Sequence, residues 1–115
     1  MIGIDIVSIQ RIEKSIEKFG DKFKYRFMTK TEIQNTTKIS SIAGIWASKE
    51  AFSKAIGTGI GADFSFLDIE IIKNKKNKPL INILNPSLKQ KLSNKNIDIS
   101  ITHDGGFAIA AVIIL

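Results

Sequence analysis

The segment from Lys38 to Ile56 constrains the fold most, because it has the pattern of one long helix with a stripe of small residues along it. Residues four apart lie on the same face of a helix. Alanine recurs here at that spacing, at Ala43, Ala47, Ala51 and Ala55. A face with so little side-chain bulk can approach a sheet closely. The pattern therefore predicts a long helix packed on strands and ended by Gly57.

The rest of the chain divides into strand and helix patterns around this segment. Aliphatic runs bounded by turn residues predict strands over residues 2–7, Phe66–Lys73, Pro79–Leu84, Ile97–Thr102 and Phe107–Ile114. The second and third of these form a hairpin across residues 74–78. The last two are joined at Asp104-Gly105-Gly106.

Capping signals predict three shorter helices. These signals are Ser8 before a helix from Ile9 to about Phe19, the Thr29/Glu32 capping box, and Asn85-Pro86 before a helix to about Leu92. Together the elements predict a single α+β domain over residues 1–115, with an antiparallel sheet and the long central helix packed on it.

Composition limits the class of protein. The chain has 115 residues, 43% of them hydrophobic, which suits one compact domain. It has no cysteine, so a metal would need oxygen ligands or His103, the only histidine. The N-terminal residues lack the basic region and long apolar run of a signal peptide, and no segment reaches the length of a membrane span. We therefore expect a cytoplasmic protein with no membrane partner.

The net charge of +6 permits an anionic partner but identifies none. Fifteen of the seventeen basic residues are lysines and isoleucine occurs twenty-three times, a bias typical of an AT-rich coding sequence. A nucleic-acid-binding domain would contact phosphates with a hairpin of four lysines, Lys73, Lys75, Lys76 and Lys78. Such surfaces usually carry interleaved aromatic residues, and after Leu67 only Phe107 is aromatic. This interpretation and a non-catalytic oligomeric interaction module stay open as alternatives to an enzyme.

Asp5 is the first candidate functional residue. The strand pattern of period two places Ile2, Ile4 and Ile6 on one face, and Gly3, Asp5 and Val7 on the other. Asp5 is a solvated carboxylate if its face is wet. Gly3 and Val7 are not typical of a wet face, and aspartate is uncommon in strands. A half-buried carboxylate is costly unless a cation or hydrogen-bond donors compensate it.

The long helix and its C-terminal end carry the next candidates. Glu50 and Lys54 lie four apart on one face, which fits either a surface ion pair or a site. The loop Gly57-Thr58-Gly59-Ile60-Gly61 follows a helix, whereas phosphate-binding glycine loops precede one. It is either a flexible cap or a loop that passes close to a ligand. His103 follows a strand and precedes a tight turn, and alone it is more often structural than functional.

Taken together, these motifs resemble the bacterial holo-[acyl-carrier-protein] synthases, which are short single-domain 4′-phosphopantetheinyl transferases. The similarity extends from Gly3 to about Val112. The matching segments, in the family's order, are GIDIVSIQRI at residues 3–12, AGIWASKEAFSKAIGTG at residues 43–59, Asp68–Ile71, Lys78-Pro79 and Ser100–His103.

The resemblance implies a reaction and a set of roles. The family transfers the 4′-phosphopantetheine group of coenzyme A to a serine of apo acyl carrier protein, in support of fatty acid biosynthesis, and releases adenosine 3′,5′-bisphosphate. Asp5 and Glu50 correspond to its magnesium ligands, and Lys54 to a lysine beside the phosphates. Mg²⁺ usually takes one or two protein carboxylates and completes its shell with waters and substrate phosphates. The identity of the general base stays open.

The resemblance also implies contacts with coenzyme A, the carrier protein and other subunits. Ser53, Gly57 and Thr58 correspond to residues of the nucleotide region. Pro79 and His103 match positions that reach the coenzyme from the neighbouring subunit of a homotrimer. The acidic carrier protein would dock on basic residues of the first helix and the residues after it, Arg11, Lys14, Lys18 and Lys22.

Four residues depart from the family's pattern. Ile45 and Lys38 stand where arginine is common, Trp46 replaces phenylalanine, and Thr102 replaces a serine before His103. Ile45 removes a charge from the expected coenzyme contacts, so we expect different phosphate contacts there. None of the four departures affects the two carboxylates.

Overall fold

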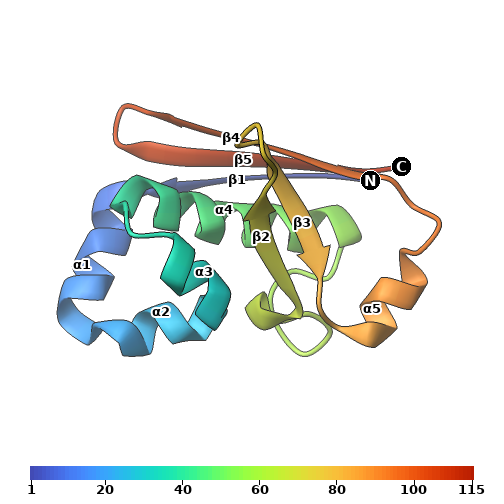
Figure 1. Ribbon diagram of the computed structural model, residues 1–115, viewed down its shortest axis with the longest axis horizontal. Coiled ribbons are helices and arrows are strands. Elements are labelled where there is room, and N and C mark those ends of the chain that lie inside the picture. The colour runs from blue at the N-terminus through green and yellow to red at the C-terminus, as the bar shows by residue number, and fades with distance from the viewer.

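The computed structural model describes residues 1–115 as a three-stranded sheet, a two-stranded hairpin and five α-helices (Figure 1). The N-terminal part contains β1 (Ile2–Ser8), α1 (Ile9–Phe19), α2 (Asp21–Phe27), α3 (Lys30–Asn35) and α4 (Ile39–Ile56). The C-terminal part contains β2 (Ile69–Lys73), β3 (Pro79–Ile83), α5 (Pro86–Lys91), β4 (Ile97–Asp104) and β5 (Phe107–Ile114). The strands pair antiparallel in the orders β1-β5-β4 and β2-β3.

The central helix α4 packs against one face of the three-stranded sheet, as the alanine stripe predicted (Figure 1). Ala47 and Ala51 are fully buried in this contact. Gly3 of β1 faces the same helix, and a side chain there would collide with the backbone of Ala51. The absence of side-chain bulk on both elements therefore sets how closely β1 and α4 approach.

The two faces of β1 have the opposite environments from those expected for an amphipathic strand. Gly3 and Val7 are buried against α4, and Asp5 on that face is half-buried. The isoleucine face points outward, where Ile2, Ile4 and Ile6 are 73%, 63% and 58% exposed. The interpretation of Asp5 as a residue on a wet strand face is therefore wrong, and the aliphatic face is the exposed one.

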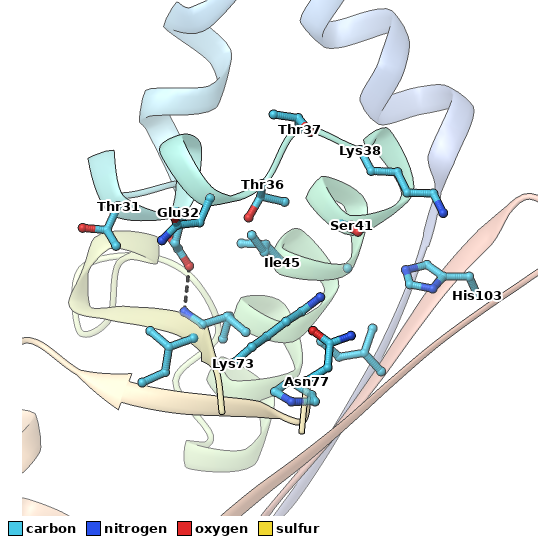
Figure 2. A pocket seen from close by; sticks show the side chains of 16 residues that line it. Thr31, Glu32, Thr36, Thr37, Lys38, Ser41, Ile45, Lys73, Asn77 and His103 are labelled. Carbon is cyan, nitrogen blue, oxygen red and sulfur yellow. Dashed lines mark hydrogen bonds between the residues drawn. The ribbon is translucent and has the colours of Figure 1, made fainter. Parts of the chain in front are cut away.

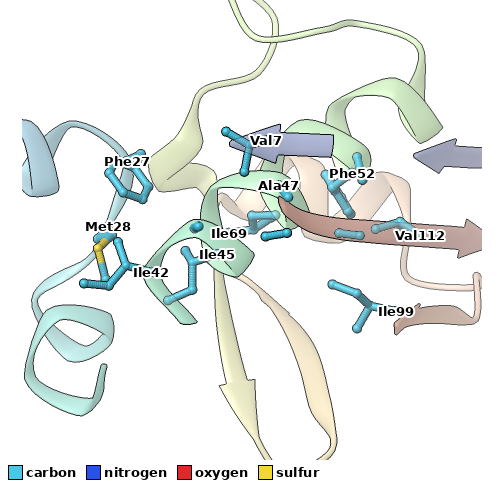
Figure 3. Packing of buried hydrophobic residues seen from close by; sticks show 14 of the residues in the cluster. Val7, Phe27, Met28, Ile42, Ile45, Ala47, Phe52, Ile69, Ile99 and Val112 are labelled. Carbon is cyan, nitrogen blue, oxygen red and sulfur yellow. The ribbon is translucent and has the colours of Figure 1, made fainter. Parts of the chain in front are cut away.

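The hydrophobic core lies between α4 and the strands (Figure 3). Phe52, Ile69 and Val112 are almost completely buried there. An aromatic cluster extends this core toward α2, with Trp46 packed 5.1 Å from the ring centre of Phe27 and 4.8 Å from that of Phe66. Trp46 thus fills the contact between α4 and the N-terminal helices.

The structure differs from the sequence-based expectation in three places. Helix α2 was not predicted, because its N-cap is Gly20 with φ of 62° and no capping side chain. Residues Phe66–Asp68 form a 3₁₀ turn under a Ser65/Asp68 capping box, so the second strand begins only at Ile69. The strands form two sheets, because the hairpin β2-β3 does not pair with the other three. The α+β class and the packing of the long helix are confirmed.

Candidate functional site

Asp5, Glu50 and Lys54 come together where β1 crosses the C-terminal half of α4. The ammonium group of Lys54 donates hydrogen bonds of 3.1 Å to Asp5 Oδ1 and to the carbonyl oxygen of Ile4. The Asp5 side chain is 15% exposed and that of Lys54 is 52% exposed. A half-buried carboxylate is thus held by a lysine that can still reach solvent.

The carboxylates of Asp5 and Glu50 repel each other across this contact. Burial raises the pKa of Glu50, and the negative charge of Asp5 raises it further. Lys54 and Arg11 act in the opposite direction, but their effect on the pKa is smaller. At Glu50, Lys54 and Arg11 therefore do not fully offset burial and the charge of Asp5, and this excess of negative charge favours binding of a cation.

These two carboxylates are a sparse ligand set. No group of three or more histidine, aspartate or glutamate side chains lies close enough to hold a metal ion by itself. A site with one or two carboxylates suits Mg²⁺, which keeps several waters and binds substrate phosphates. The pair formed by Asp5 and Glu50 fits that ion and does not fit a metal that needs a full protein cage.

The loop after α4 borders this site. Gly57 and Gly59 have positive φ values of 84° and 65°, and the amides of Thr58 and Gly59 turn back onto the Ser53 carbonyl oxygen. Thr58 is exposed, as a ligand contact requires. Ser53 is fully buried and its hydroxyl donates a 2.6 Å hydrogen bond to the Glu50 carbonyl oxygen, so its side chain is not presented to a ligand.

A separate pocket of about 600 Å³ lies between α3, the start of α4, the hairpin and the end of β4 (Figure 2). Pro79 and His103 line it, and His103 Nε2 lies 2.9 Å from the carbonyl oxygen of Ser40. In Figure 2, Lys38 lies next to His103, and Lys73 lies across from them. The only carboxylate in its wall is Glu32, which is paired with the buried Lys49. The pocket is therefore positively charged overall.

Helix α4 separates the pocket from the two carboxylates. Asp5 pairs with Ala110 of β5, which pairs in turn with Ile101 in the pocket wall. Two strand spacings thus separate Asp5 from Ile101, about 9–10 Å between backbones. The pocket lining includes none of the residues at the Asp5 site. Within one chain, the structure brings together Asp5, Glu50 and Lys54, and separately Pro79 and His103, but not the two groups.

The predicted docking residues are exposed on the N-terminal helices. Arg11, Lys14 and Lys18 lie on α1, whereas Lys22 belongs to α2, beyond the break at Gly20. Arg11 is near enough to act on the charge of Glu50. The basic surface of α1 therefore begins at the edge of the carboxylate site. None of the helices combines the length and apolar character that crossing a bilayer requires.

The sequence profile of the 4′-phosphopantetheinyl transferase superfamily matches residues 1–112. The chain belongs to this superfamily. A holo-[acyl-carrier-protein] synthase of Nautilia profundicola is 56% identical over 115 residues, which cover 100% of this chain and 99% of that relative. Another from Campylobacter fetus is 54% identical over 114 residues, covering 99% and 98% of the two chains.

Solved structures of the superfamily have the same fold. The crystal structure of Helicobacter pylori holo-[acyl-carrier-protein] synthase in complex with coenzyme A gives a TM-score of 0.91 at 51% identity and covers 100% of both chains. A Bacillus anthracis synthase in complex with CoA (3′,5′-ADP) gives 0.81 at 37% identity, covering 98% of this chain and 93% of that one. The family and fold expected from the sequence motifs are confirmed.

Sequence reasoning missed several features of this transferase. It did not assign Lys38, Lys73 and Asn77 to the pocket, because they come from three separate segments. Asn77, with a positive φ of 65°, lies in the hairpin turn that brings Lys73 and Pro79 together. Asparagine is common at such turn positions, so Asn77 was the residue in the sequence that could have indicated this turn. It also gave no role to Lys49, whose burial is not visible in the sequence.

Proposed function

We propose that Asp5, Glu50 and Lys54 form the centre at which the chain transfers the 4′-phosphopantetheine group of coenzyme A to a serine of apo acyl carrier protein. The observation that carries this proposal is the paired, half-buried carboxylates of β1 and α4 beside an exposed lysine. In the reaction, the serine hydroxyl gives up its proton to solvent, its oxygen forms a bond to the phosphorus of phosphopantetheine, and the bond from that phosphorus to adenosine 3′,5′-bisphosphate, the leaving group, breaks.

Asp5 and Glu50 hold Mg²⁺ in this proposal. When bound, the ion neutralises charge on the pyrophosphate as the bond breaks. Lys54 already lies 3.1 Å from Asp5 and is half exposed, so its ammonium group can turn to a phosphate oxygen without leaving the site. Gly57 and Thr58 bring the loop backbone alongside the same phosphates.

The nucleotide end of coenzyme A binds in the positively charged pocket. A phosphate monoester carries close to two negative charges near neutral pH. Lys38, Lys73 and His103 supply positive charge or hydrogen-bond donors from three sides of the pocket, and Ile45 in its wall supplies none. The lysines Lys38 and Lys73 have no carboxylate partner. They thus provide the charge that Ile45 does not.

The pocket and the carboxylates that act on one coenzyme belong to neighbouring subunits of a homotrimer. Two observations support this arrangement. The groups lie on opposite sides of α4 within one chain. The outer face of β1 and β5 is apolar, with exposed Ile2, Ile4, Ile6, Phe107 and Ile113, and such a surface is typical of a subunit interface.

The acidic carrier protein docks on the basic residues of α1 and α2. Arg11, Lys14, Lys18 and Lys22 are exposed, and none of them is in an ion pair. Because Arg11 lies at the edge of the carboxylate site, a carrier bound along α1 presents its serine to that site. The lysines of the hairpin turn suit nucleic acid less well, because Lys78 is paired with Asp98 at 2.7 Å and Lys73 lines the pocket.

The direct test incubates the protein with apo acyl carrier protein, coenzyme A and Mg²⁺, and weighs the carrier protein by mass spectrometry. We expect the mass of one phosphopantetheine group to be added to the carrier. A competent carrier that gains no mass would contradict the proposal. Omission of Mg²⁺ in the presence of a chelator is the matched control.

A further inference from the structure

Lys49 is a fully buried lysine that is not part of the proposed transfer centre. Its side chain has no exposed surface. Its ammonium group donates one hydrogen bond of 2.7 Å to Glu32 Oε1 and another of 2.7 Å to the carbonyl oxygen of Phe27. Phe27 is the last residue of α2, and Glu32 belongs to α3. One side chain of α4 is thus tied to two other helices by short, buried hydrogen bonds.

Glu32 extends this connection to the hairpin. Its carboxylate accepts hydrogen bonds from the amide of Thr29 at 2.8 Å and from the amide of Ile71 in β2 at 2.7 Å. Its side chain is 1% exposed, and no buried polar side-chain atom of the protein lacks a hydrogen-bond partner. The pair formed by Lys49 and Glu32 therefore joins α2, α3, α4 and β2 at one point.

The alanine stripe and the buried serines of α4 attach the helix less directionally. On the sheet side, the methyl groups of Ala47 and Ala51 face the strands, where β1 has Gly3. This contact determines the distance between helix and sheet more strongly than the rotation of the helix about its axis. Ser48 and Ser53 use their hydroxyls within the helix. Lys49 makes the only buried side-chain hydrogen bonds from α4 to other elements. It therefore constrains the rotation and the axial position of the helix, together with the packing of Trp46 and Phe52.

Glu50 is the next residue along α4, and its position depends on that rotation. Successive residues of an α-helix are 100° apart around the axis, so Glu50 points away from Lys49 toward β1. A carboxylate lies roughly 6 Å from the helix axis, and turning the helix by about 10° moves it by about 1 Å. An error of that size in a catalytic group can lower a rate by about a hundredfold.

We propose that the buried ion pair of Lys49 with Glu32 is a positioning element that holds Glu50 in register with Asp5. This proposal rests on the proposed role of Glu50 in transfer. It also accounts for the presence of charges where hydrophobic residues would pack. A buried ion pair is often no more stabilising than hydrophobic side chains of equal volume. Its distinguishing property is direction, which hydrophobic contacts lack.

The test is the double variant Lys49→Met/Glu32→Gln, which removes both charges and nearly preserves volume. The readouts are kcat, the KM for coenzyme A and the Mg²⁺ concentration at half-maximal rate. We expect kcat to fall about tenfold or more and the Mg²⁺ requirement to rise, while the KM for coenzyme A at saturating Mg²⁺ stays within about twofold. Val112→Ala, a change at a buried core position of β5, is the control for lost stability.

The outcomes separate positioning from stability. A double variant that keeps kcat and the Mg²⁺ requirement of the parent overturns the proposal. So does a fall in kcat no larger than that of Val112→Ala at equal loss of melting temperature. If the double variant does not fold, Lys49→Gln, which keeps a donor for the Phe27 carbonyl oxygen, is measured against the same two criteria. Failure of the parent protein to modify the carrier would instead refute the proposed function.

Discussion

Gly3 of β1 lies directly against the backbone of Ala51 in α4, with no space for a side chain between them. A methyl group at Gly3 would fall 2.6 Å from the amide nitrogen of Ala55 and closer still to the carbonyl oxygen of Ala51. These obstacles are backbone atoms, which cannot move without moving the helix. The contact fixes the distance between the strand of Asp5 and the helix of Glu50.

We therefore expect Gly3→Ala to destabilise the fold and separate the two carboxylates. Overpacking of this kind costs about 1–3 kcal/mol or more, measured by urea unfolding. Gly61→Ala is the matched control, because an added methyl group there meets nothing within 4 Å and the backbone has no positive φ. Equal stability of the two variants would show that β1 is not held at this distance.

Removal of either carboxylate should abolish transfer and preserve the fold. We expect Asp5→Asn and Glu50→Gln each to lower kcat/KM by about a hundredfold or more, because both remove charge that the Mg²⁺ site needs. The measurement is the rate of mass gain on the carrier protein. Asp98→Asn is the control, since Asp98 is an exposed carboxylate paired with Lys78. Full activity of the Asp5 or Glu50 variant at limiting Mg²⁺ would refute the ligand assignment.

The affinity for Mg²⁺ should fall in mild acid because of Glu50. Burial, followed by the negative charge of Asp5, raises the pKa of Glu50, so protons compete with the metal above the usual range of about pH 4–5 for glutamate. The folding stability of the metal-free protein should change with pH in the opposite direction to the Mg²⁺ affinity. The stability from protonated Glu50 is fully present below the ordinary pKa and is lost as pH rises through the raised pKa.

Calorimetric titration with Mg²⁺ in the presence of coenzyme A, from about pH 5 to pH 8, measures this competition. We expect the apparent affinity to rise with pH in the parent protein. The rise should be much flatter in Glu50→Gln, which has no proton to lose. An affinity independent of pH in the parent protein would contradict the assignment of Glu50.

The cations of the pocket should govern recognition of coenzyme A. We expect Lys73→Ala to raise the KM for coenzyme A by about tenfold with little change in kcat, because it removes a charge-assisted contact to a phosphate. The increase in KM caused by Lys73→Ala should be smaller with 3′-dephospho-coenzyme A, which lacks that phosphate. Lys75→Ala is the control, since Lys75 lies in the same turn but does not line the pocket. An equal increase in KM for both substrates would show that Lys73 does not contact the 3′-phosphate.

Sharing of the site between subunits can be tested by mixing variants. Asp5→Ala lacks a carboxylate, and a Lys38→Ala/His103→Ala variant lacks pocket groups on the other side of α4. In mixed trimers, some interfaces combine an intact carboxylate pair with an intact pocket. We expect co-refolded mixtures to regain activity that neither variant has alone. Additive activity with no gain would show that each chain uses its own pocket.

Local patterns in the sequence were sufficient for most of the fold. The alanine stripe predicted α4, Ser8 and the Thr29/Glu32 capping box predicted the starts of α1 and α3, and both hairpins were found. These signals work because they depend on neighbours within a few residues. Helix α2 lacks such a signal, since it begins at Gly20 and is held by burial of Phe23 and Phe27.

For the candidate site too, some features could be predicted from local sequence and others could not. The sequence by itself was enough to select Asp5, Glu50 and Lys54 as the residues proposed to carry the chemistry, because they lie in motifs that are recognisable without a structure. Only the tertiary structure decided that Asp5 faces inward, that Ser53 is turned into the core and that Lys49 is buried against Glu32. Burial and the meeting of distant charges depend on how elements pack, and packing is a property of the whole chain that no local pattern records.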